Sequence, residues 1–187
     1  MRTVFALVAL VFSASPSALA ANPVSPGLVG AWNLVRVETI RQDGAVIYPF
    51  YGKHPRGLII YDPSGWMSVQ IVSDPKPTVP IGKSRDAFRN APAGEKAIAA
   101  DGYYAYFGRY TVDPVASTVT HHLQDSLYPG ERGEDFVRHF QVTEGCLTLV
   151  AQIQEMGELH QRRLIWKRSA ASGAVTQAAV KGDCVEQ

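Results

Sequence analysis

Short runs that alternate between apolar and polar residues recur along this chain, and they constrain its fold more than any other feature. The runs cover residues 30–41, 45–51, 57–61, 66–73, 104–112, 118–127, 135–143, 146–153 and 160–168. Turn sequences such as Asp43-Gly44, Pro129-Gly130 and Glu144-Gly145 separate them. Alternation with a period of two is typical of strands that bury one face, and these dipeptides favour tight antiparallel connections. The pattern therefore predicts an all-β protein of eight or nine short strands.

The short connections favour an up-and-down order of these strands. Such a meander has two unpaired edges, and closure into a barrel removes both. Composition agrees with this fold, because 187 residues with 46% hydrophobic residues suit one compact domain, and 16 glycines with 12 prolines suit many turns. We expect an up-and-down antiparallel β-barrel.

One long segment, residues 74–103, interrupts the alternation. It begins with a proline-rich stretch at 74–80 and later contains good helix formers from Glu95 to Ala100. Because inserted loops of this length often cover a binding site, we expect a loop and a short helix that act as a lid.

The first twenty residues have the pattern of a signal peptide. Arg2 precedes a short apolar run from Val4 to Phe12, and Ala18-Leu19-Ala20 offers a cleavage site. No other segment is long and apolar enough to span a bilayer, so no stable membrane insertion is expected. We expect a signal peptide at 1–20, a barrel domain at 21–168, a tail at 169–187, and a periplasmic or extracellular location.

Charge and cysteine content limit the partners of the chain. Its 18 basic and 17 acidic residues leave a net charge of +1, which does not predict a nucleic-acid surface. Cys146 and Cys184 would meet an oxidising compartment after export, so we expect a disulfide, with two free thiols as the alternative. The histidines do not stand at zinc-ligand spacing from either cysteine, and neither a metal nor a cofactor is expected.

A series of motifs spread over residues 28–168 resembles a known family. Gly30-Ala31-Trp32 looks like the Gly-x-Trp signature of lipocalins. The further motifs of the series are Tyr48-Pro49-Phe50, Pro55-Arg56-Gly57-Leu58, Ile60-Tyr61, Gly65-Trp66-Met67-Ser68, 101–108 and Val119-Thr120-His121-His122. The whole series resembles the bacterial and fungal lipocalin-like domain family, whose fold is a calycin-like β-barrel. The resemblance implies a carrier of small molecules or, as in some related barrels, a cyclase or isomerase.

The register of the hairpins predicts which residues face the barrel interior. The turn Glu144-Gly145 pairs Thr143 with Cys146 and therefore Phe140 with Leu149. The same parity places His121 beside Phe140, Leu123 beside Arg138, and Asp125 beside Phe136. In the preceding hairpin it places Tyr110 opposite His121 and Tyr106 opposite Asp125. The predicted cavity residues are Tyr106, Tyr110, His121, Leu123, Asp125, Phe136, Arg138 and Phe140, and the last strand adds Arg162, Leu164 and Trp166.

The charged residues among these positions have two interpretations. In the structural one, Asp125 neutralises Arg138, while the resemblance to lipocalins implies that Arg162 packs across Trp32 and closes one end. In the functional one, these groups orient the polar part of a bound molecule. Two positive charges against one negative charge then indicate a small, largely apolar ligand with an acidic or strongly accepting group.

An enzyme is the alternative function. A cofactor-independent isomerase or cyclase would use His121 as a base oriented by Asp125, with Tyr106 or Tyr110 as the acid. The sequence contains no Gly-x-Ser-x-Gly motif of the kind that exposes the nucleophile of a serine hydrolase.

The first strand does not alternate cleanly. Trp32 and Leu34 share one parity, while Val35 and Val37 share the other. A β-bulge, whose position the sequence leaves open, is needed if all four are buried.

Overall fold

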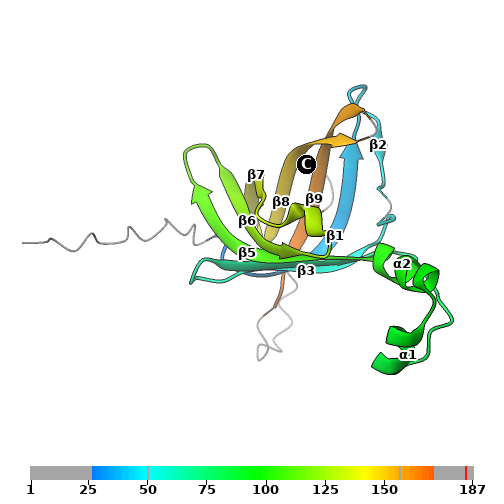
Figure 1. Ribbon diagram of the computed structural model, residues 1–187. Coiled ribbons are helices and arrows are strands. Elements are labelled where there is room, and N and C mark those ends of the chain that lie inside the picture. The colour runs from blue at the N-terminus through cyan, green and yellow to red at the C-terminus, as the bar shows by residue number, and fades with distance from the viewer. Residues whose placement is uncertain (1–26, 50, 156, 171–183, 185–187) are drawn as a thin grey trace, which may run out of the picture.

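The computed structural model describes residues 27–49, 51–155, 157–170 and 184, and it is a closed antiparallel β-barrel. The strand order is β2-β1-β3-β4-β5-β6-β7-β8-β9, and β1 also pairs with β9 (Figure 1). This last pairing closes the eight-stranded barrel and leaves β2 as an extra strand beside β1. The strands are β1 (Gly30–Ile40), β2 (Val46–Ile47), β3 (Arg56–Tyr61), β4 (Trp66–Val72), β5 (Tyr103–Asp113), β6 (Thr118–Ser126), β7 (Asp135–Thr143), β8 (Cys146–Glu155) and β9 (Glu158–Arg168).

The observed strands confirm the predicted all-β meander. The run at 45–51 yields only the two residues of β2, because Pro49 has no backbone N–H for a longer ladder. The predicted signal peptide at 1–20 and most of the tail at 169–187 lie outside the described residues. Within those residues, no helix has the length and apolar character that crossing a bilayer requires.

The bulge expected in the first strand lies at Val35. Between β1 and β9 the register shifts after Leu34, which pairs with Trp166, and before Arg36, which pairs with Ile165. Leu34 and Val37 are therefore both buried in the core, although they differ in parity.

Arg168 packs against Trp32 where β9 ends and β1 begins. Its guanidinium lies 4.0 Å over the ring of Trp32 and donates hydrogen bonds to the carbonyls of Gly27 and Val29. Gly30 has a φ of +130°, and a Cβ there would lie 2.9 Å from Nη1 of Arg168. The assignment of this role to Arg162 was wrong, because Trp32 pairs directly with Arg168 in the β1–β9 ladder.

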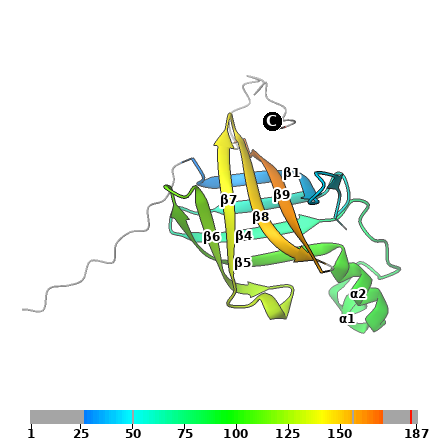
Figure 2. The same ribbon diagram turned by 90° about the horizontal axis from the view of Figure 1, so that it is seen from above.

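The segment 74–103 contains two short helices, α1 (Arg85–Asn90) and α2 (Ala93–Asp101). The helix expected at 95–100 is part of α2, whereas α1, capped by the hydroxyl of Ser84, was not predicted. Figures 1 and 2 show both helices beyond the start of β5, outside the barrel. Neither has a buried residue, and none of the described cavity-lining residues comes from 74–103, so the structure does not show the expected lid.

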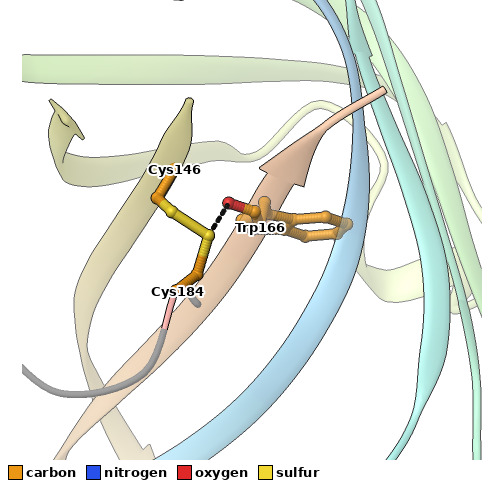
Figure 3. The surroundings of a disulfide bond; sticks show 3 residues. All are labelled: Cys146, Trp166 and Cys184. Atoms are coloured by element: carbon orange, nitrogen blue, oxygen red, sulfur yellow. Dashed lines mark hydrogen bonds between the residues drawn. A yellow bond between two sulfur atoms is a disulfide. The ribbon is translucent and has the colours of Figure 1, made fainter. Parts of the chain in front are cut away.

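A disulfide joins Cys146 at the start of β8 to Cys184 (Figure 3). The two Cα atoms are 5.8 Å apart, and Sγ of Cys184 lies 4.0 Å from the carbonyl oxygen of Trp166. The bond confirms the disulfide interpretation and excludes the alternative of free thiols. It connects the C-terminal part of the chain to the barrel wall.

Candidate functional site

The barrel contains a cavity of about 360 Å³. Its wall is mainly apolar, and its polar members are tyrosines, two arginines, two glutamates and one glutamine. The lining residues are Val37, Tyr51, Ile59, Val69, Ile71, Tyr104, Tyr106, Tyr128, Glu131, Phe136, Arg138, Leu149, Gln152, Ile153, Glu155, Arg162, Leu164 and Trp166.

The structure brings some of the predicted residues to the cavity and leaves others in the core around it. Tyr106, Phe136 and Arg138 line the cavity, as do Arg162, Leu164 and Trp166 from β9. The remaining inward-facing residues lie elsewhere: Tyr110, His121 and Leu123 are buried in the core, and Phe140 packs against it. The predicted parity is thus correct for all of these positions, while ligand contact stays a prediction.

Asp125 was placed in the cavity, and this prediction was wrong. The β5–β6 register pairs Gly108 with Leu123 but Phe107 with Asp125, so Gln124 is an extra residue in β6. This bulge turns the carboxylate of Asp125 outward, where its side chain is 43% exposed and lies 3.0 Å from Nη2 of Arg132. Hydrogen bonds from Arg132 and from the Ser126 backbone lower the pKa of Asp125.

This correction removes two proposed roles for Asp125. The carboxylate neither neutralises Arg138 nor orients His121, because it pairs with Arg132 on the outside of the barrel. Gly108 was the sequence signal for the bulge. A Cβ at this position would lie 2.0 Å from the carbonyl oxygen of His122, so only glycine allows β6 to approach this closely.

The register between β6 and β7 also differs from the prediction. Val119 pairs with Arg138 and His121 with Phe136, whereas the sequence analysis placed His121 beside Phe140 and Leu123 beside Arg138. The difference is four positions along β7, and because it is even, every side chain keeps its face. The connection contains the 3₁₀ helix η1 (Pro129–Glu131) and is too long to fix the register from a turn motif.

A histidine between two tyrosines lies beside the cavity. The Tyr61 hydroxyl is 2.7 Å from Nε2 of His121, and the Tyr106 hydroxyl is 2.9 Å from Nδ1. Burial, and secondly the charge of Arg138, hold the pKa of His121 well below its ordinary value. Burial raises the pKa of Tyr106 to about 12 against the opposing effect of Arg138. At neutral pH the imidazole is therefore uncharged and the Tyr106 phenol is protonated.

This arrangement does not match the predicted catalytic groups. His121 has no exposed surface and is not among the described lining residues. The hydroxyl of Tyr110 donates to the carbonyl of Asp62 at 2.9 Å, away from the cavity lining. Only Tyr106 of the four proposed catalytic residues lines the cavity, so the base, its carboxylate and the second acid are not assembled there.

Two glutamates that the sequence analysis missed contribute to the cavity wall. Glu131 accepts hydrogen bonds from Tyr104 at 2.8 Å and from Ser126 at 2.6 Å. Glu155 accepts from Arg162 at 2.8 Å, and Nε of Arg162 donates to Thr39 at 3.2 Å. Glu131 reaches the wall from the irregular connection after β6, which strand periodicity does not describe. Glu155 is therefore paired with Arg162, whereas Glu131 accepts from two neutral hydroxyl groups and forms no ion pair with a described residue.

Arg138 differs from Arg162 in its surroundings. Its guanidinium lies 5.1 Å from the ring centre of Phe136, its Nη1 lies 3.5 Å from the carbonyl oxygen of Val137, and its charge opposes the rise of the Tyr106 pKa. Across the described ranges, no ion pair includes Arg138. Among the described residues, Arg138 thus has no carboxylate as an ion-pair partner, although Glu131 lines the same cavity.

Trp166 adds an unsatisfied donor to the same wall. Its side chain is fully buried, and its indole N–H has no acceptor among the residues that the structure describes. Buried N–H groups are normally hydrogen-bonded, so this unpaired donor in the wall is unusual. No cluster of three or more potential metal ligands occurs within the described part of the chain.

A closed eight-stranded meander with an internal cavity is the architecture of the calycin-like ligand-binding barrels. Comparison with protein families matches residues 29–169 to the lipocalin-like domain, and the chain belongs to this family. No curated protein matches the chain. Membership confirms the fold expected from the sequence motifs and suggests a small-molecule binding protein, while the ligand has to be argued from the cavity itself.

Proposed function

We propose that this protein is an exported carrier that binds a small, largely apolar molecule with an acidic or strongly accepting group inside the barrel. The observation that supports the acidic group is Arg138, a cavity-lining arginine for which the described residues supply no carboxylate partner. A charge in a largely apolar wall is stabilised by an opposite charge or an acceptor, and a bound anion supplies one.

The size and character of the cavity limit the ligand further. A volume of about 360 Å³ lies near the lower end of the ~300–1,000 Å³ range of small-molecule pockets. Lining residues such as Ile59, Val69, Ile71 and Leu149 offer apolar contact rather than polar recognition. We infer a compact ligand with an apolar body, such as a medium-chain fatty acid, an aromatic acid or an isoprenoid acid.

Export is part of the proposal and rests on the sequence of residues 1–20. The disulfide between Cys146 and Cys184 supports it, because such bonds persist in oxidising compartments. Localisation of the tagged full-length chain in its own host tests this part. Retention in the cytoplasm with an uncleaved N-terminus would contradict it.

Native mass spectrometry of the protein purified from its host tests the binding function. We expect a bound molecule of small mass and, for the purified protein, a thermal shift with members of a panel of fatty acids, aromatic acids and isoprenoids. An empty barrel together with no shift for any member of the panel would overturn the proposal.

A further inference from the structure

We propose that Tyr61 holds His121 as the Nδ1–H tautomer, and that His121 thereby fixes the Tyr106 hydroxyl as a hydrogen-bond donor into the cavity. Together with the indole N–H of Trp166, Tyr106 then forms a binding site that offers donors only. Such a site takes a carboxylate or carbonyl group and disfavours an ammonium group. The ligand part of this inference rests on the proposed function, whereas the tautomer does not.

The argument starts at Tyr61, whose side chain is completely buried. Among the described residues, its hydroxyl has one hydrogen-bond partner, Nε2 of His121 at 2.7 Å. If Nε2 carried the proton, the Tyr61 oxygen would accept and its own O–H would be a buried donor with no acceptor. Because a buried unpaired donor is unfavourable, Tyr61 donates and Nε2 accepts.

The state of Nε2 determines that of Nδ1. A neutral imidazole carries one proton, so an accepting Nε2 places the proton on Nδ1. Burial and the charge of Arg138 keep the pKa of His121 far below neutrality, which excludes the doubly protonated ring at neutral pH. Nδ1–H therefore donates to the oxygen of Tyr106, 2.9 Å away.

The hydrogen bond from His121 determines what the Tyr106 hydroxyl can offer to the cavity. Its oxygen receives the hydrogen bond from His121, and the positive charge of Arg138 acts on the same hydroxyl. Its own hydrogen is then free for another partner, and Tyr106 is one of the residues that line the cavity. His121 is thus a positioning residue, because it orients the Tyr106 hydroxyl without lining the cavity itself.

Trp166 provides an independent observation that points to the same ligand chemistry. Its N–H is buried and has no acceptor within the described ranges, and its side chain also lines the cavity. The carboxylates of the lining, Glu131 and Glu155, already accept hydrogen bonds from Tyr104, Ser126 and Arg162. Both bonds to Glu131 end on its Oε2, so the donor character belongs to the part of the wall formed by Tyr106 and Trp166, and that part favours a ligand that places its acceptor atoms there.

The tautomer is tested on the ligand-free protein by ¹⁵N NMR of the histidine side chains at neutral pH. We expect the His121 ring to show a protonated Nδ1 and an unprotonated Nε2. The opposite pattern would overturn the inference, because Tyr106 would then donate to His121 and not to the cavity. If His121 served only to fill the core, either ring nitrogen could carry the proton.

The donor site is tested by calorimetry with three probes of similar length: decanoate, the neutral ketone 2-undecanone, and decylammonium. We expect Tyr106→Phe to weaken binding of decanoate and 2-undecanone roughly 10- to 100-fold. Tyr110→Phe is the matched control, since it removes a buried hydroxyl that donates to Asp62 away from the cavity lining, and it should leave both affinities unchanged.

The indole N–H resonances supply a second measurement on the same samples. Decanoate should shift the Trp166 signal, while Trp32, whose N–H already donates to Leu28, should change little. Equal affinities of Tyr106→Phe and Tyr110→Phe for the ketone, or equal binding of decylammonium and decanoate by the wild type, would overturn the donor site and leave the carrier function standing. Binding of none of the three probes would count against both.

Discussion

At the scale of single residues, the charge of Arg138 has the clearest experimental consequence. Replacing Arg138 by Met keeps much of the apolar stem and removes the charge. Because no carboxylate of the described structure pairs with Arg138, we expect the free energy of unfolding to change by less than about 1 kcal/mol. The affinity for decanoate should fall by about tenfold or more. Urea midpoints and calorimetry on the same variant measure both quantities.

Arg132→Met is the matched control for this variant. Arg132 pairs with Asp125 on the exposed side of the barrel, where ion pairs contribute about 0–1 kcal/mol, and its loss should not affect decanoate binding. Asp125→Asn and Arg138→Met should be additive in a double-mutant cycle, because Asp125 pairs with Arg132 instead. A loss of about 3–5 kcal/mol in Arg138→Met with unchanged affinity would instead identify a buried structural ion pair.

His121 makes stability depend on pH. Its folded-state pKa is far below the ordinary value of 6.5, so the folded protein leaves it unprotonated where the unfolded chain binds a proton. This contribution is fully present above about pH 6.5 and is lost as the pH falls toward the depressed pKa, at up to about 1.4 kcal/mol per pH unit.

The pH dependence is measured by urea unfolding between pH 7 and 5. His121→Gln should show a shallower decline than the wild type, because the variant has no group to protonate at this position. The pKa values of Asp62 and Asp125 are lowered from the ordinary 3.8, so these groups affect stability only below the pH range of this measurement. Parallel curves for the two proteins would show that His121 titrates normally in the fold.

At the scale of elements, the bulge in β6 explains why Asp125 lies outside the barrel. Gly108→Ala would place a Cβ 2.0 Å from a backbone carbonyl, so we expect a loss of several kcal/mol in the free energy of unfolding or failure to fold. Gly94→Ala in α2 is the control, since nothing lies within 4 Å of a Cβ there, and it should stabilise by about 0.5–1 kcal/mol. A stable Gly108→Ala variant, measured by urea unfolding, would contradict this account of the bulge.

The strands and their faces were predictable because alternation and turn residues are local. The Glu144-Gly145 turn fixed the pairing of Thr143 with Cys146, as the structure confirms. What was not predictable depended on how distant backbones approach one another. The bulge beside Gly108 and the long connection around η1 changed two registers, and one of these changes moved Asp125 to the surface.

The candidate site was predictable in part for the same reason. Tyr106, Phe136 and Arg138 line the cavity because parity alone determines their direction. The partner of each polar group depends on which strand positions lie side by side, and there the sequence analysis failed. It did not predict the contacts of His121 with Tyr61 and Tyr106.

At the scale of the whole molecule, the barrel is closed by contacts between its first and last strands. The β1–β9 ladder runs from Trp32 with Arg168 to Ile40 with Gln161. Because the strands between them pair with their neighbours in sequence, this closure is the longest-range step of the fold and joins both ends of the domain. The disulfide adds a second, covalent connection near the same end, at the start of β8.

This disulfide should stabilise the barrel without determining its topology. Cys146 and Cys184 are 38 positions apart, and for a loop of this length the chain-entropy model gives up to about 4 kcal/mol, a large share of the 5–15 kcal/mol typical of a domain. We expect reductant to lower the urea midpoint of the wild type while the far-UV circular dichroism keeps its β-sheet form, because the strand ladders do not involve the sulfur atoms. The double variant Cys146→Ser, Cys184→Ser lacks the bond, so its urea midpoint should be lower than that of the oxidised wild type. This midpoint should not change when reductant is added, which controls for other effects of the reagent. A wild-type midpoint that is the same in both conditions would show that the bond adds nothing to stability, and loss of the β-sheet spectrum on reduction would show that the barrel depends on it.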